Sequence, residues 1–256
     1  MVVNRKKEDN QKEKKKMAVR SLFVDSSQRI NGSDTSFMVE FQQSLENKPF
    51  EYCCIEKASI PLTFYNISTE LSTSTFTIND GSDDVAITLT EGQYSATELA
   101  SHMETVLNTL SSGFSVDFDS ITGFITIART SNFSIDLSTK ENLARLLGFA
   151  QEDHTATDSY SSTNIVNMRP VKNFFLFIDE IQTDINHCYS SIGSDITAIW
   201  PMEGSLGEIQ YITAEDRQKY KLNGCRISTR LHVKLQIEEG TLNLNGHSFQ
   251  FLLRLW

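Results

Sequence analysis

The side chains best suited to metal chemistry are scattered along this sequence. Its five histidines are His102, His154, His187, His232 and His247. They form no HxH or HExxH pattern, whereas zinc and related metals need several ligands brought to one point. His187-Cys188 is a neighbouring pair, but adjacent residues of a strand face apart. We therefore predict no metal site, and surface or structural roles for the histidines.

Paired acids are the second group that could do chemistry, either as acid–base catalysts or as calcium ligands. They are Asp83-Asp84, Glu152-Asp153, Asp179-Glu180 and Glu238-Glu239. They lie at expected turns or strand ends and lack the spacing of a calcium loop. No phosphate loop or nucleophile elbow accompanies them. The sequence thus predicts no catalytic residue, no cofactor and no enzyme, with a cupin-like metalloenzyme as the one enzymatic alternative.

Charge divides the chain into a basic arm and an acidic body. The net charge is −10, yet the first 16 residues carry seven basic side chains against three acids. These basic residues are Arg5, Lys6, Lys7, Lys12, Lys14, Lys15 and Lys16. An acidic body argues against a domain that grips nucleic acid with its main surface. For the arm, residues 1–19, three interpretations stay open: a solubilising tail, a clamp on neighbouring subunits, or a charge contact with DNA or a membrane.

Cellular location is weakly constrained. The N-terminus has no apolar stretch, and the longest apolar run, residues 174–178, is far shorter than a membrane span. We expect neither a signal peptide nor a transmembrane segment. The four cysteines form no CxxC motif, which favours free thiols in a reducing compartment.

Alternating apolar residues predict a mainly β protein. The pattern is strict in residues 231–238, and residues 249–255 alternate to the end of the chain, which favours a strand held inside a sheet. Asn245-Gly246 between them is a hairpin signal. About eight strands in residues 20–67 and 151–256 predict a single jelly roll, an antiparallel sandwich of two sheets. An immunoglobulin-like sandwich competes, but its cysteine and tryptophan pattern is missing.

Residues 68–150 have a different texture and predict an inserted α+β module. Two helices are expected in it, each after a capping box: Ser95 to Glu98 and Ser138 to Glu141. Separate short strands are expected at Ile125/Ile127 and at Phe133/Ile135/Leu137. The polar residues 150–164 are interpreted as a loop that returns to the jelly roll.

Two stretches carry a family likeness: Phe50 to Ile67, which ends in Ile60-Pro61-Leu62-Thr63-Phe64-Tyr65-Asn66-Ile67, and Leu231 to Ile237 continued by Leu242 to Leu253. A glycine-tyrosine step, Glu91-Gly92-Gln93-Tyr94, stands before the first expected helix. With them, most of residues 20–256 resembles the penton, or minor capsid, proteins of virophages, Polinton-like viruses and related large DNA viruses. Many relatives place a tryptophan at the position of His247 or Ser248, and this chain does not.

The resemblance implies a jelly-roll homopentamer at the fivefold vertices of an icosahedral capsid. Its partners would be further copies of itself, the major capsid protein and other minor capsid proteins, in a virion assembled inside the host cell. Phe64, Tyr65 and Asn66 are candidate subunit contacts, because aromatic rims anchor interfaces. The alternative for that corner is a core strand end. The alternative for the whole chain is a receptor- or glycan-binding accessory protein of the virion.

Overall fold

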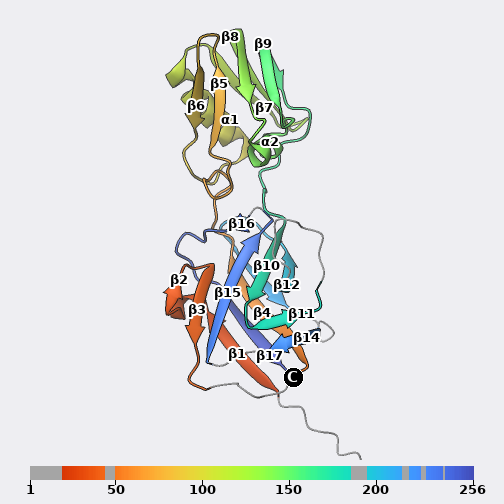
Figure 1. The fold of residues 1–256 in the computed structure, drawn as a ribbon. Helices are drawn as coiled ribbons and strands as arrows, with labels where there is room; N and C mark the ends of the chain where they lie inside the picture. Colours follow the sequence, from red (N-terminus) through yellow and green to blue (C-terminus); the bar gives the residue numbers. More distant parts are fainter. Residues whose placement is uncertain (1–18, 44–49, 186–194, 215–218, 226–228, 239) are drawn as a thin grey trace, which may run out of the picture.

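Two bodies lie end to end in the computed structural model of this chain (Figure 1). It describes residues 19–43, 50–185, 195–214, 219–225, 229–238 and 240–256. Two sheets form the lower body in the figure, and a third sheet with two helices forms the upper one. The chain passes between them twice, once after β4 (Tyr52–Pro61) and once before β10 (Asn173–Ile178).

The first sheet is centred on β4. Its order is β1-β17-β4-β14-β11, with β13 also paired to β4. The other strands are β1 (Arg20–Asp25), β17 (Gln250–Leu255), β13 (Ile209–Thr213), β14 (Tyr220–Cys225) and β11 (Ile181–Thr183). With ten residues, β4 is long enough to pair with β13 over residues 57–61 and with β14 at residues 52–53.

The second sheet has the order β12-β10-β15-β3-β2, with β16 paired to β15. Its strands besides β10 are β12 (Ile196–Pro201), β15 (Arg230–Ile237), β3 (Ser36–Glu40), β2 (Asn31–Gly32) and β16 (Gly240–Thr241). The strict alternation in β15 places Leu231, Val233, Leu235 and Ile237 inside. Burying each of these side chains contributes about 1.5–3 kcal/mol.

The strand order confirms the predicted jelly roll. Eight strands, numbered first to eighth along the chain, are β1, β3, β4, β10, β12, β13, β15 and β17. The first sheet orders them first, eighth, third, sixth, and the second sheet orders them second, seventh, fourth, fifth. This winding of two Greek keys defines a jelly roll. As expected from its apolar alternation, β17 lies inside a sheet, between β1 and β4.

The turn at Asn245-Gly246 forms, but the predicted hairpin is wrong. Both residues have positive φ, 51° and 81°. However, β16 pairs with β15 in the second sheet, while β17 pairs with β1 and β4 in the first. The segment therefore carries the chain across the sandwich, because the dipeptide specifies the bend and not the partner of the strand that follows.

The upper body has its own sheet and its own apolar core. The sheet order is β6-β5-β8-β7, with β9 also paired to β8. The strands are β5 (Thr75–Asn79), β6 (Asp84–Thr88), β7 (Phe114–Asp119), β8 (Phe124–Asp136) and β9 (Asp153–Ser161). Helices α1 (Ala96–Leu110) and α2 (Glu141–Leu147) contribute Leu99, Met103 and Leu146 to this core, which shares no residue with the core of the sandwich.

One of the two predicted capping boxes is confirmed. At the start of α1, the Glu98 amide donates to the Ser95 hydroxyl, and the Ser95 amide donates to the Glu98 carboxylate. The box before α2 is wrong, because the Ser138 hydroxyl donates to Asp136 instead, and α2 begins after Lys140 without a side-chain cap.

Two strand predictions in the upper body need correction. The two short strands at 125–127 and 133–137 are one strand, β8, which spans 13 residues. The predicted loop at 150–164 is wrong, since Asp153–Ser161 forms β9 and pairs with β8. The small sheet thus extends beyond residue 150, where the sequence places the end of the module. Polar alternation in an exposed strand gives little apolar signal to detect.

Candidate assembly surfaces

Asn66 joins the two bodies. Its side chain is fully buried, and its amide nitrogen donates to the carbonyl oxygens of Tyr94 at 2.7 Å and Met168 at 3.3 Å. Its amide oxygen accepts from the backbone N–H of Tyr94 at 3.0 Å. Tyr94 precedes α1, and Met168 lies on the segment that returns to the sandwich. The Asn66 side chain therefore links, by hydrogen bonds, the segment that leaves the sandwich, the start of the module and the returning segment.

The same outgoing segment also binds the crossover of the sandwich. The Thr63 hydroxyl donates to the Leu244 carbonyl at 2.6 Å, and the Asn245 side chain donates to the Thr63 carbonyl at 2.5 Å. Ile67 and Gly92 exchange two backbone hydrogen bonds, of 3.2 and 3.0 Å. Parts of the two penton-like stretches and the glycine-tyrosine step, far apart in sequence, therefore meet at one junction between the bodies.

The junction explains where the three candidate contact residues lie. Phe64 is buried and packs edge-on against Phe174, with ring centroids 6.3 Å apart. The Asn66 side chain is buried and hydrogen-bonded within the chain. Tyr65 is 39% exposed, so of the three it alone presents a side chain to a partner. The seven basic residues of the arm lie outside the part of the chain that the structure describes, as do His187 and Cys188.

Several of the histidines and paired acids that the structure describes have local partners. His102 stacks on Tyr94 at 5.2 Å and accepts a hydrogen bond from the Thr90 amide. His232 bonds Glu180 through its ring and its backbone. Asp179 pairs with Lys234 at 3.1 Å. Across the described ranges, no three His, Cys, Asp or Glu side chains gather closely enough to hold a metal ion.

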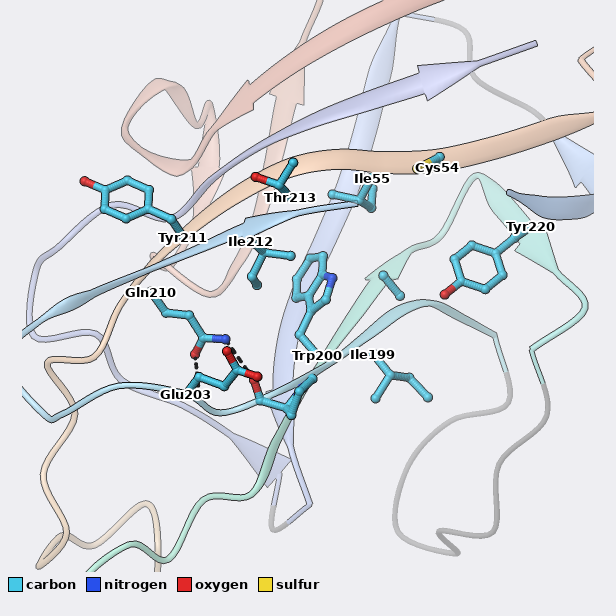
Figure 2. A pocket seen from close by; sticks show the side chains of 12 residues that line it. Cys54, Ile55, Ile199, Trp200, Glu203, Gln210, Tyr211, Ile212, Thr213 and Tyr220 are labelled. Carbon is cyan, nitrogen blue, oxygen red and sulfur yellow. Dashed lines mark hydrogen bonds between the residues drawn. The ribbon is translucent and has the colours of Figure 1, made fainter. Parts of the chain in front are cut away.

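A cavity opens between β12 and β13, at the side of the sandwich where both sheets end (Figure 2). Its volume is about 310 Å³. Figure 2 shows the side chains of Trp200 and Ile212 extending into the space between the two strands, while Tyr211 extends from β13 to the other side. Cys54 and Tyr220 complete one end of the lining.

The lining of this cavity is mostly neutral. Burial raises the pKa of the Cys54 thiol, with a smaller contribution from the charge of Glu56, and burial likewise raises the pKa of the Tyr220 hydroxyl. Both groups therefore carry a proton at physiological pH. The buried Gln210 amide donates to the Pro201 carbonyl at 2.8 Å and accepts from the Glu203 amide at 3.0 Å. Glu203 and Gln210 add polar side chains to the lining, so the cavity is not purely apolar.

Sequence reasoning missed the cavity and the apolar residues near the sandwich edges. On β13 the burial is inverted, with polar Gln210 inside and Ile209 and Tyr211 outside, the latter 77% exposed. On β1, at the opposite edge of the same sheet, Phe23 is 61% exposed. Apolar side chains on the solvent side of edge strands mark association surfaces. The signal in the sequence is three adjacent apolar residues, Leu22 to Val24, where alternation leaves one outside.

None of the helices that the structure describes is both long and apolar enough to cross a membrane.

The architecture defines a jelly-roll protein with an α+β module between its third and fourth strands.

The fold is similar to two solved virus structures. One is the selenomethionine-labelled mavirus penton protein, with a TM-score of 0.47 and 8% identity over 93% of this chain and 98% of that one. The other is a cryo-EM structure of the Sputnik virophage, with a TM-score of 0.41 and 12% identity over 92% of this chain and 97% of that one. No family model and no curated protein matches the sequence.

Proposed function

We propose that this chain is a structural capsid protein, the homopentameric penton subunit at the fivefold vertices of an icosahedral virion. The observation that supports the proposal is that residues 63–67, 92–94 and 244–245, which belong to the penton-like stretches and the glycine-tyrosine step, meet at the Asn66 junction. Chance likenesses scattered over the chain would have no reason to contact one another. These stretches form one structural unit, which sets an α+β module on the end of a jelly roll.

The jelly roll also provides surfaces for association rather than for chemistry. In the part of the first sheet that the structure describes, β1 and β13 each pair with one strand and leave an edge open. A ring of identical subunits needs two different sides on each copy, because its interfaces are heterologous. Contacts with the major capsid protein, with other minor capsid proteins and through the basic arm belong to the same proposal.

Two measurements test this function. Native mass spectrometry of the full chain should give a species of five times 28.9 kDa. Coexpression with the major capsid protein should give shells in which cryo-EM places this chain at the fivefold vertices. A strictly monomeric chain that never joins shells would refute the proposal, and a glycan array positive for that monomer would favour the accessory role instead.

Deleting residues 1–18 separates the interpretations of the arm. A solubilising tail predicts normal shells, and a clamp predicts shells without pentons. A charge contact with DNA predicts that the variant forms normal empty shells but loses pentons from filled particles, whereas filled wild-type particles keep their pentons at low salt and release them as salt rises, since phosphate contacts weaken steeply with ionic strength.

A further inference from the structure

The first sheet ends in two strands whose outer edges are open. Among the described residues, β1 pairs only with β17, and β13 pairs only with β4. Soluble proteins usually protect such an edge with lysine, proline or a covering segment, because its unpaired N–H and C=O groups attract other strands. Neither β1 nor β13 contains lysine or proline, whereas β12, at the edge of the second sheet, ends in Pro201. The two edges of the first sheet are therefore unprotected.

The backbone groups that β13 leaves free follow from its bonds to the sheet. Residues opposite each other in an antiparallel pair alternate between exchanging backbone hydrogen bonds and exchanging none. The Leu62 amide donates to the Glu208 carbonyl at 2.8 Å, and the Ala214 amide donates to the Glu56 carbonyl at 2.9 Å. Every second residue from Glu208 to Ala214 therefore bonds β4 or the segment that continues it. The N–H and C=O groups of the residues between them point to the open side, and these residues are Ile209, Tyr211 and Thr213.

The same alternation holds on β1. The Ser26 amide donates to the Phe249 carbonyl at 2.9 Å, one step beyond the last pair of β1 and β17. Every second residue before Ser26 therefore bonds β17. The residues between them have N–H and C=O groups that point to the open side, and they are Ser21, Phe23 and Asp25. Each edge thus offers three residues with both backbone groups free.

The side chains of these residues lie on the outer face of the first sheet. Phe23 is 61% exposed and Tyr211 is 77% exposed. Figure 2 shows the Tyr211 side chain extending away from the space between β12 and β13, although Tyr211 also lines the cavity there. The cavity separates the β13 edge from β12, so this edge is accessible to another strand.

Strand direction suits pairing of the two edges between copies. β1 is antiparallel to β17, β17 to β4 and β4 to β13, so β1 and β13 of one copy run in opposite directions. Rotation about an axis along the strands keeps every copy pointing the same way. In a ring of copies, β13 of one subunit therefore meets β1 of the next as an antiparallel strand.

One register uses every free group. Placing Phe23 opposite Tyr211 sets Ser21 opposite Thr213 and Asp25 opposite Ile209, and these three pairs can exchange two backbone hydrogen bonds each. A shift by two residues leaves one residue of each edge without a partner. The register also opposes two aromatic rings and two hydroxyls, which are favourable cross-strand pairs, and opposes no like charges.

We propose that β1 of one copy pairs with β13 of the next in this register, and that the pairing joins the first sheets of neighbouring subunits. The inference rests on the proposed homopentamer and names the two strands that form its interface. The contact is heterologous, so an open chain of copies always leaves one β1 and one β13 unpaired. Only a closed ring uses all of them.

Two double variants test whether positions 23 and 211 face each other. Phe23→Lys with Tyr211→Glu opposes unlike charges across the contact, whereas Phe23→Glu with Tyr211→Glu opposes like charges. Both side chains are exposed, so both variants should keep the fold by circular dichroism. In a dilution series followed by native mass spectrometry, the like-charge variant should dissociate more readily, with a Kd per contact about 3- to 30-fold higher than that of the unlike-charge variant. Ile121→Glu is the matched control, since Ile121 is 95% exposed on the module, and it should stay pentameric.

A cysteine pair tests the register. Opposed residues that exchange backbone hydrogen bonds have Cα atoms about 5.5 Å apart, within the range of about 4.4–6.8 Å that a disulfide spans. Phe23→Cys with Tyr211→Cys should therefore form covalent oligomers of up to five chains under oxidation, seen on a non-reducing gel. Phe23→Cys alone should form none, which controls for the native cysteines, and neither should Phe23→Cys with Thr213→Cys, which is shifted by two residues.

Each result decides the proposal. Equal dissociation of the two double variants, together with no disulfide in the Phe23→Cys and Tyr211→Cys pair, would overturn this contact. If the wild-type chain is pentameric in that case, the penton proposal stands and the two edges are left to strands of another protein. Disulfides in the shifted pair instead of the aligned pair would overturn the register. A wild-type monomer would overturn both proposals.

Discussion

The side-chain amide of Asn66 and the backbone of Tyr94 form a reciprocal pair of hydrogen bonds, at 2.7 and 3.0 Å, that links the jelly roll to the α+β module. The relationship changes what a family-like motif means in this chain. In the step Tyr65-Asn66-Ile67, the asparagine holds the two bodies together, and its buried side chain is unavailable to a partner subunit. Conserving such a motif would conserve the angle at which the module leaves the sandwich.

Replacing Asn66 with leucine should therefore destabilise the protein. The substitution keeps similar bulk but leaves the N–H and C=O of Tyr94 and the carbonyl of Met168 without this partner. Buried polar groups left unpaired cost about 1–3 kcal/mol each, so the loss of partners for three groups should lower the free energy of unfolding by at least about 3 kcal/mol in urea titration. Limited proteolysis should also cut faster near residues 63–68.

Asn243→Ala is the control for that experiment. Asn243 is exposed at the same junction; it donates a long hydrogen bond, of 3.4 Å, to Glu70 and accepts one of 2.8 Å from the Asn245 amide. Because both bonds are exposed, the substitution should lower stability by no more than about 1 kcal/mol. If both substitutions lowered the free energy of unfolding by the same amount, the buried hydrogen bonds of Asn66 would stabilise the protein no more than the exposed ones of Asn243 do.

Gly148 gives a second test, at the end of α2. Its φ is +77°, and a Cβ there would lie 2.1 Å from the backbone oxygen of Asn164. The Gly148 carbonyl also accepts from the amides of Thr163 and Asn164, which anchors the returning chain. Gly148→Ala should lower stability by more than about 3 kcal/mol, because the clash is with backbone that is itself held in place.

Gly81→Ala measures the cost of placing alanine in a left-handed backbone conformation when no steric clash accompanies it. Gly81 has a similar φ of +101° but no atom within 4 Å of the added Cβ. It should lose only about 1 kcal/mol, the penalty for a left-handed alanine. If the Gly148→Ala and Gly81→Ala variants lost the same amount of thermal stability, the close approach to Asn164 would have no effect on stability.

The jelly roll was predictable because its signals are repetitive. Alternation in β15 and β17 fixes two buried faces, and the apolar character of β17 correctly indicates an interior strand. Pairing partners were harder: Asn245-Gly246 announces a turn, but nothing local says that β17 crosses to the other sheet. The capping box at Ser138 failed because α2 begins two residues later, after Lys140, so Ser138 is not the residue that precedes the helix.

The candidate surfaces were mostly hidden from sequence reasoning. Phe64 and Tyr65 are both aromatic and adjacent, yet one packs on Phe174 and the other is exposed, a difference set by the tertiary path of the chain. The cavity beside Trp200 requires β12 and β13 to end different sheets at the same side. Such a relationship belongs to the winding of eight strands, and no short window of residues contains it.

Acid should weaken the module. Hydrogen bonds from the hydroxyls of Ser82, Thr122 and Ser138 hold the pKa of Asp80, Asp119 and Asp136 below the ordinary value. A carboxyl with a lower pKa in the folded chain stabilises it above the unfolded pKa, about 3.9 for aspartate, and this stability is lost as pH falls through the folded pKa. The protection factors of amides in residues 75–161, corrected for the intrinsic exchange rate at each pH, should therefore fall between about pH 4 and pH 2.

Ser138→Ala provides the internal control for the acid response. It removes the first of the hydrogen bonds that lower the pKa of Asp136, so the variant should be less stable at pH 7 and lose less stability on acidification. Protection factors in the module that stay constant down to pH 2, or that rise, would contradict the assignment of these carboxyls.

The separation of the two apolar cores predicts two unfolding transitions. Leu99 is fully buried in the core of the module and Leu253 in the core of the sandwich, and the two clusters have no residue in common. Truncating a buried leucine to alanine costs about 2–5 kcal/mol, and the loss is local to the cooperative unit that contains it. Leu99→Ala should lower only the module transition in calorimetry, and Leu253→Ala only that of the jelly roll. Both variants shifting a single shared transition would mean that the Asn66 junction couples the bodies into one cooperative unit, and Asn66→Leu should then split it.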